Sequence, residues 1–199
     1  VMYNPAHFTE TRPDELHRII RAHPLGVLCT AGPQGLDANH LPFHLLDDNT
    51  LIAHVARANP LWQTVPSGSE ALVVFRGAEG YVSPSWYPSK QATHRAVPTW
   101  NYEVVHAHGV LTVRDDEKFV RGVVARLTRT HEAGQPEPWK MGDAPPDYLD
   151  QMLRAIVGIE LRITRLEGKR KLSQNRDAAD RGGVMAHAAA PLAQAMRSA

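Results

Sequence analysis

The chain has 199 residues, of which 43% are apolar and 22% charged, a composition typical of a globular protein rather than a disordered one. Its formal net charge is +1, from 22 basic and 21 acidic side chains, which excludes the strong basic excess of a dedicated DNA-binding domain. The single cysteine, Cys29, excludes an internal disulfide or a multi-cysteine zinc site, and we interpret it as a small buried hydrophobe.

The first half of the chain predicts one helix followed by antiparallel strands. The helix begins after Thr11, which can cap it, and ends at His23, because the residue before a proline leaves the helical region. Strands separated by turn residues are predicted over 26–30, 36–46, 50–54 and 71–75. Short turns between successive strands favour a meander over a βαβ repeat.

The second half adds further strands and inserts helices late. We predict a strand over 104–113, a helix from 115 to 131, a proline-rich loop over 134–146, a short helix to Leu153 and a strand over 159–164. This order indicates a mainly β (α+β) fold, an antiparallel barrel with flanking helices. We predict one domain over residues 1–180 and an alanine-rich, weakly patterned tail over 181–199.

Two polar-aromatic segments indicate a binding site after strand ends. In 54–60, Arg57 follows a strand among small residues and can offer a planar fork to a phosphate, or can simply lie on the surface. Segment 81–90 combines three aromatics, two prolines, three serines and a lysine. It suits a wall for a planar heterocycle or a dimer interface, and one segment could serve as both.

Two more segments fit a plain structural role poorly. In 97–102, Thr99 and Asn101 can hydrogen-bond a polar ring edge beside Trp100, although a buried tryptophan is the alternative. In 169–176, four cations frame a serine, a glutamine and an asparagine. The alternative there is a solvated face, and this cluster is the one basic patch that we nominate.

Eleven histidines raise the alternative of a metal or haem site. His106 and His108 are spaced to share a strand face, and His40 and His44 are predicted to do the same on another strand. The sequence has no H-E-x-x-H motif and no Cys/His finger, so we predict no metal site. It also has no G-x-G-x-x-G, P-loop or G-x-S-x-G motif, which makes a Rossmann dinucleotide enzyme, a P-loop NTPase and an α/β-hydrolase poor candidates. No apolar run is long enough to cross a membrane and no apolar signal region begins the chain, so we expect a cytoplasmic protein.

The chain resembles the FMN-binding negative transcriptional regulators, the PaiB-like branch of the flavin split-barrel superfamily. The resemblance runs from the N-terminus to about Asn175, through Met2-Tyr3 with Pro5 and Phe8, N-H-L-P-F (39–43), H-V-A-R-A-N-P (54–60), Y-V-S-P-S-W-Y (81–87), V-P-T-W-N-Y (97–102) and K-L-S-Q-N (171–175). It implies a six-stranded antiparallel Greek-key split β-barrel related to pyridoxamine-phosphate oxidases and flavin reductases. It also implies a homodimer with FMN in a groove between subunits.

The resemblance implies an FMN site, with the phosphate near Arg57 and Lys90 as a second cation. The full set of cofactor-binding candidates is His54, Ala56, Arg57, Asn59, Ser85, Trp86, Lys90, Thr99, Trp100, Asn101, Lys171, Ser173, Gln174 and Asn175. Residues 171–175 would close the site from the second subunit. No residue is assigned a catalytic role.

The resemblance implies a flavin-dependent transcriptional repressor, in a family linked to sporulation and protease production. It names DNA as a partner, which neither the charge nor any helix-turn-helix pattern supports. The alternatives are an FMN-dependent oxidoreductase on a small substrate, a haem- or metal-binding relative, and a flavin-free dimer with a structural role.

Overall fold

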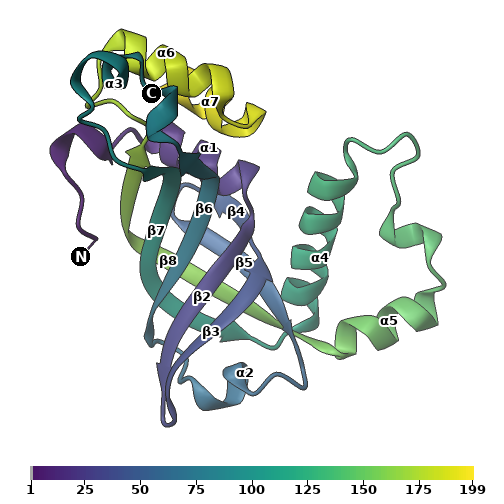
Figure 1. Cartoon of the computed structure of the whole chain (residues 1–199). Coiled ribbons are helices and arrows are strands. Elements are labelled where there is room, and N and C mark those ends of the chain that lie inside the picture. Colours follow the sequence, from purple (N-terminus) through teal and green to yellow (C-terminus); the bar gives the residue numbers. More distant parts are fainter. Residues whose placement is uncertain (1) are drawn as a thin grey trace. The chain divides into compact units, whose positions relative to one another are not determined.

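The computed structural model describes residues 2–199 and contains one sheet of eight strands with flanking helices (Figure 1). The strand order is β3-β2-β6-β7-β8-β5-β4, and β1 pairs with β8. The strands are β1 (Thr9–Glu10), β2 (Leu25–Gly32), β3 (Gly35–Pro42), β4 (His44–Asp47), β5 (Thr50–Ala56), β6 (Glu70–Val82), β7 (Thr99–Arg114) and β8 (Ile156–Lys171).

Seven α-helices and three short 3₁₀ turns connect and flank these strands. The α-helices are α1 (Pro13–Ala22), α2 (Leu61–Thr64), α3 (Pro88–Thr93), α4 (Glu117–Glu132), α5 (Pro146–Arg154), α6 (Ala178–His187) and α7 (Ala190–Arg197). The 3₁₀ turns are η1 (Ala6–Phe8), η2 (Pro84–Trp86) and η3 (Met141–Asp143). Within residues 2–199, no helix has the length and apolar character that a membrane span needs.

The chain forms two compact units. Unit 1 comprises the described residues of Val1–His23 with Phe75–His106 and Glu167–Ala199. Unit 2 comprises Pro24–Val74 and Ala107–Leu166. Strands β6, β7 and β8 contribute residues to both units, so each unit has its own stretch of these strands.

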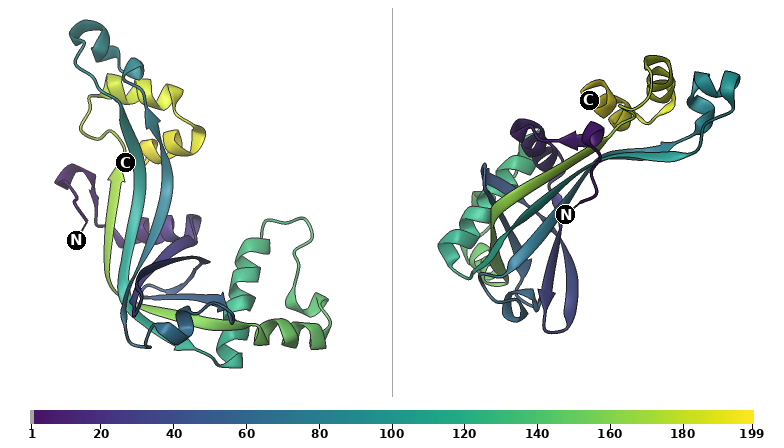
Figure 2. Two further views of the ribbon diagram at one scale, coloured as in Figure 1. Left: turned by 60° about the horizontal axis from the view of Figure 1, so that its bottom comes forward. Right: turned by 90° about the vertical axis from the view of Figure 1, so that its left-hand side faces the viewer.

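In unit 1, helices α6 and α7 lie along one side of the strands (Figure 2). The face they cover is apolar, and its buried side chains form a core, composed of Ala78, Val82, Tyr87, Leu172, Val184, Leu192, Ala195 and Met196. Gly183 lets α6 approach closely, because a side-chain carbon there would lie only 2.0 Å from the carbonyl oxygen of Trp86. This core of unit 1 therefore joins residues 78–87 to the C-terminal part of the chain.

In unit 2, β2 and β3 form a hairpin that ends with Gly32 opposite Gly35, whose φ of +106° suits glycine. β5 pairs antiparallel with β8 from Thr50↔Arg162 to Ala56↔Ile156. Helix α4 lies beside β4 and β5, where Ile52, Val123 and Leu127 form a buried cluster. This packing fixes α4, which borders a cavity in unit 2.

The antiparallel sheet with flanking helices is as predicted, but the strand number of six is wrong. The predicted strand 36–46 divides at Phe43 because its two halves pair with different strands: β3 pairs with β2, and β4 pairs with β5. The Phe43 side chain is buried. β1, which is only two residues long, adds the other uncounted strand.

β6 and β8 run further than the predicted 71–75 and 159–164, and each continues through a glycine. In β6, Gly77 leaves room for Glu103, because a Cβ added at Gly77 would lie only 2.8 Å from the Cβ of Glu103. Gly168 continues β8 beneath α1, where an added Cβ would lie 2.1 Å from Leu16. Both glycines serve close packing within unit 1.

The alanine-rich tail folds into helices. The expected domain boundary at residue 180 falls inside α6, and α7 buries Leu192 and Met196 in the unit 1 core. Small alanines weaken the amphipathic signal in sequence, yet they let both helices lie close to their neighbours.

Candidate functional site

The strands of unit 1 carry two lysines among aromatic rings on the face opposite α6 and α7. Because side chains alternate along a strand, Trp100 and Tyr102 share one face of β7, and Lys169 and Lys171 share one face of β8. Lys169 Nζ lies 5.6 Å from the centroid of the Tyr102 ring, so these faces coincide. The rings of Tyr81 and Trp100 meet edge to face at 6.4 Å. We call these five residues the lysine–aromatic face.

Both lysines of this face lack an acidic partner. Lys169 is only 7% exposed, and its Nζ donates to the carbonyl oxygen of Tyr3 at 2.9 Å. Lys171 Nζ donates to the carbonyl oxygen of Trp100 at 2.6 Å and to the hydroxyl of Thr99. Burial lowers the pKa of Lys171, and the charge of Lys169 lowers it further. Among residues 2–199 neither lysine forms an ion pair, so a bound anion would relieve the repulsion between them.

Polar residues on the opposite face of the same strands support this arrangement. Asn101 is buried, and its Nδ2 donates to Ser173 Oγ at 2.9 Å. Ser173 is buried and has a φ of +64°, an unusual conformation for a residue other than glycine. The predicted residues Thr99, Trp100, Asn101, Lys171 and Ser173 are thus brought together at the ends of β7 and β8.

The remaining unit 1 candidates have local partners. Lys90 Nζ donates to Ser85 Oγ at 3.3 Å, and the Trp86 ring stacks on His187 with centroids 5.8 Å apart. Gln174 accepts from the Leu172 amide and donates to the Arg170 carbonyl oxygen, which closes the turn after β8. Asn175 is exposed beside this turn. The glutamine therefore shapes the backbone that presents Ser173.

In unit 2, the guanidinium of Arg57 already has partners for its donors. It forms a forked ion pair with Asp115, with N···O distances of 2.6 and 2.9 Å. It also donates to the carbonyl oxygens of Arg154 at 2.7 Å and Ile156 at 3.2 Å. A phosphate at Arg57 would have to compete with Asp115, whose pKa this hydrogen bonding lowers.

The three neighbouring candidates lie on β5 or in the turn that follows it. His54 is half-buried, and burial lowers its pKa, which favours the neutral ring. Ala56 ends β5 opposite Ile156. Asn59 donates to Asn39 Oδ1 at 2.7 Å and accepts from the amide that begins α2, so its amide group stabilises the turn.

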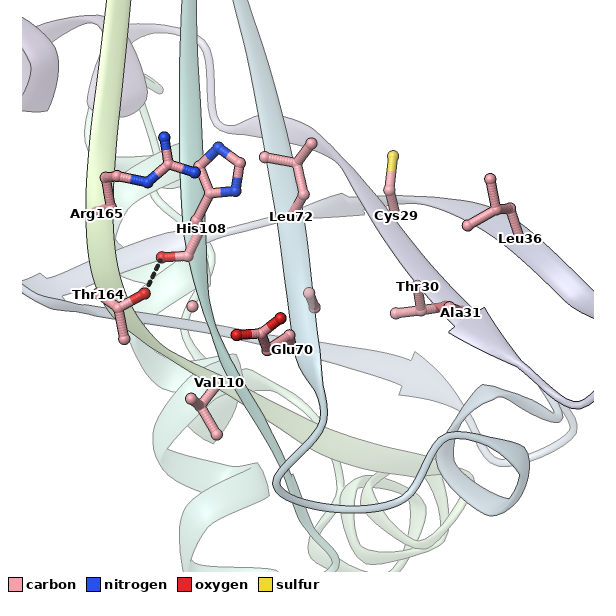
Figure 3. A pocket seen from close by; sticks show the side chains of 12 residues that line it. Cys29, Thr30, Ala31, Leu36, Glu70, Leu72, His108, Val110, Thr164 and Arg165 are labelled. Atoms are coloured by element: carbon pink, nitrogen blue, oxygen red, sulfur yellow. Dashed lines mark hydrogen bonds between the residues drawn. The ribbon is translucent and has the colours of Figure 1, made fainter. Parts of the chain in front are cut away.

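A pocket of about 560 Å³ opens on the sheet of unit 2 (Figure 3). Arg165, His108, Leu72 and Cys29 line it from β8, β7, β6 and β2 respectively. Gly109 is also among its lining residues, and Cys29, interpreted from sequence as buried, is half-buried and lines the pocket. The volume is in the range of small-molecule sites, but none of the predicted cofactor residues lines this pocket.

Sequence reasoning left Lys169, Tyr81 and Tyr102 off the candidate set. The sequence does hold a signal for Lys169, because two residues that are two positions apart on a strand share one face. That signal applies to Lys169 and Lys171 only if the strand extends beyond the predicted end at residue 164, as β8 does. His106 and His108 do share β7, whereas His40 and His44 lie on two different strands, contrary to the prediction, since the chain changes its pairing partner from β2 to β5 between them.

Comparisons with known proteins agree with the fold. A family model described as "Putative FMN-binding domain" matches residues 2–165. An uncharacterized protein of Aspergillus fumigatus is 34% identical over 92% of this chain and 89% of its own length. Protease synthase and sporulation protein PAI 2 of Bacillus subtilis is 31% identical over 90% of this chain and 85% of its own length.

Among solved structures, the flavocytochrome Anf3 from Azotobacter vinelandii superposes with a TM-score of 0.64. The match has 13% sequence identity and covers 82% of this chain and 69% of that one. This likeness concerns the fold, and it confirms the predicted split-barrel class with flanking helices.

Proposed function

Since this chain belongs to the FMN-binding domain family that includes protein PAI 2, we propose that it binds FMN on the lysine–aromatic face of unit 1. The observation that carries the proposal is the pair Lys169 and Lys171, two partly or fully buried ammonium groups without a carboxylate partner among residues 2–199. When bound, FMN would supply one- or two-electron redox chemistry, while the protein supplies binding and electrostatics.

The chemistry of this face fits the two ends of FMN. A phosphate dianion bound beside Lys169 and Lys171 would accept charge-assisted hydrogen bonds and neutralise both cations. Trp100 and Tyr81 are 50% and 48% exposed, so they offer flat apolar surface to an isoalloxazine ring. Thr99 adds a hydroxyl next to Lys171.

Titration of FMN followed by flavin fluorescence quenching tests this assignment. Lys171→Met and Lys169→Met should each weaken binding about 10-fold or more, the scale of a charged hydrogen bond. Lys140→Met, which removes an exposed lysine in unit 2, is the control and should leave the dissociation constant unchanged.

Arg57→Ala separates this site from the phosphate position predicted by sequence. If the paired lysines hold the phosphate, Arg57→Ala changes FMN affinity less than Lys171→Met does. If Arg57→Ala is the more damaging variant, the phosphate lies at Arg57 after displacing Asp115, and the lysine assignment is wrong.

We further propose that the protein is a homodimer. The support is the apolar surface around the unit 2 pocket, where Leu36 is 88% exposed. Analytical ultracentrifugation should give twice the 22.0 kDa chain mass, and Leu36→Glu should shift the equilibrium toward the monomer. A wild-type protein that sediments as a monomer at micromolar concentration would refute the dimer.

We propose a regulatory role on the basis of PAI 2, which is named for protease synthesis and sporulation. In this role FMN would act as a redox or ligand sensor. Duplex binding measured across a salt series tests direct repression, and affinity that never exceeds the non-specific level excludes it. Steady-state NAD(P)H oxidation with added FMN would instead support the oxidoreductase alternative.

A further inference from the structure

A second cavity, of about 390 Å³, borders helix α4 in unit 2. Its apolar part comes from Ile52, Phe119 and Val123, with Leu46 at the edge. Leu46 is 42% exposed, so apolar surface continues out of the cavity into solvent. The volume is sufficient for a small organic molecule, and no residue assigned to the FMN site lines it.

The acidic groups of this cavity are neutralised by one arginine. Arg114 donates to Glu160 at 3.1 Å and approaches Asp116 at 3.4 Å. The guanidinium carbon of Arg114 also lies 4.5 Å from the centroid of the Phe119 ring, which holds it against the cavity wall. Both carboxylates of the lining therefore have their charge partner.

Two further cations of the lining, by contrast, have none. Lys118 and Arg126 are exposed and form no ion pair with any of residues 2–199. Arg126 Nη1 donates only to the carbonyl oxygen of Gly122, at 3.0 Å, one turn earlier in α4. The cavity thus combines an apolar interior with two positive charges at its edge that lack a counter-ion.

Gly122 adds space to this cavity at some cost to the helix. Glycine inside a helix is less favourable than alanine by about 1 kcal/mol. Here it lines the cavity, and an added Cβ would lie 3.0 Å from the mobile end of Arg126. A larger side chain at this position could therefore be accommodated by the protein while it fills the cavity.

We propose that this cavity binds an amphipathic organic anion, a carboxylate with an aliphatic tail. The tail occupies the apolar interior beside Phe119 and Ile52, and the carboxylate lies at the edge between the unpaired cations Lys118 and Arg126. A nucleic-acid backbone would use the cations but leave the apolar interior empty, so the amphipathic ligand fits the lining better. This inference does not depend on the proposed FMN site.

Octanoate, acetate and 1-octanol are matched probes for the proposal. Calorimetric titration of the 199-residue chain should show saturable octanoate binding at 1:1 stoichiometry, with amide chemical shifts changing along α4. Acetate, which lacks the tail, and 1-octanol, which lacks the charge, should each bind at least about 10-fold more weakly. Equal affinity for octanoate and 1-octanol would overturn the role of the cations.

Variants locate the binding site within the cavity. Lys118→Met and Arg126→Met should each weaken octanoate binding about 5- to 10-fold, while Arg129→Met, which removes an exposed α4 cation outside the lining, should not. Gly122→Leu should abolish binding by filling the space without changing charge, with normal unfolding behaviour. Unchanged octanoate affinity in Gly122→Leu, or preferred binding of duplex DNA to α4, would refute the proposal.

Discussion

Replacement of Arg170 by methionine tests the buried charge network behind the lysine–aromatic face. The Arg170 side chain is 2% exposed, and its Nε donates to Glu103 Oε1 at 2.7 Å, where Glu103 is 1% exposed. Its other nitrogens donate to the carbonyl oxygens of Ala195 and Ser198, at 3.1 Å each, and to Ser198 Oγ at 2.8 Å. One side chain therefore connects β8, β7 and the C-terminal end of α7.

The expected cost of Arg170→Met is about 3 kcal/mol in the free energy of unfolding. Breaking a buried ion pair from one side costs about 3–5 kcal/mol, because it leaves a buried charge without a partner. The lower end applies because Arg18 still lies 3.2 Å from Glu103 and is 42% exposed, so it supplies part of the compensation.

Urea unfolding followed by circular dichroism measures this cost. The double variant Arg170→Met/Glu103→Leu removes both charges and should recover most of the lost stability, since an apolar pair of similar volume often replaces a buried ion pair. Arg95→Met, which removes an exposed arginine of unit 1, is the control and should change stability by less than about 0.5 kcal/mol. A cost below about 1 kcal/mol for Arg170→Met, or a double variant less stable than the single one, would refute the reasoning.

Three further predictions concern the stability of unit 1. Gly168→Ala should destabilise the protein by about 1–3 kcal/mol in urea unfolding, because its Cβ would lie 2.1 Å from Leu16; an unchanged midpoint would show that α1 moves freely. Arg12 lowers the pKa of Glu10 from 4.5 to about 2, so this carboxylate contributes stability above pH 4.5 that is lost as pH falls toward 2. The loss is at most about 3 kcal/mol, and Glu10→Gln should show a shallower decline over that range; parallel curves would contradict this. Asp180→Ala should cost about 1–3 kcal/mol in thermal unfolding, since this buried carboxylate accepts two hydrogen bonds from Ser89 of α3; a neutral result would mean that water replaces it.

Much of the architecture follows from local pattern. A turn before residues 50–54 and alternating apolar residues in 159–164 predict two strands, and the structure pairs them antiparallel as parts of β5 and β8. The helix after Thr11 and the helix over 115–131 are present as α1 and α4, since capping and dipole preferences act within a few residues. The predicted Thr11 cap is wrong, because α1 has Arg12 as its N-cap without a side-chain cap hydrogen bond, whereas Asp116 caps α4 by accepting from the amide of Phe119 at 2.8 Å. The resemblance carried by six segments identified the family correctly.

The candidate site could be predicted only in part. The segments containing Thr99 and Lys171 were identified by their residue types, and the structure brings their side chains into contact. The sequence could not show that Arg57 forms an ion pair with Asp115, because the two residues are 58 positions apart and meet only after folding. For the same reason the sequence could not single out Lys169, because its burial without a carboxylate partner depends on residues that surround it only in the folded protein.

The sequence by itself determined the antiparallel class, most strands and helices, and the family, because periodicity, turns and motifs are local properties. Only the tertiary structure decided which charges are compensated, where β6 and β8 end, and that the alanine-rich tail belongs to the core. Those outcomes depend on contacts between distant segments, such as Gly168 against Leu16 and Arg170 against the end of α7. The positions of such contacts are set by packing, and no local pattern encodes them.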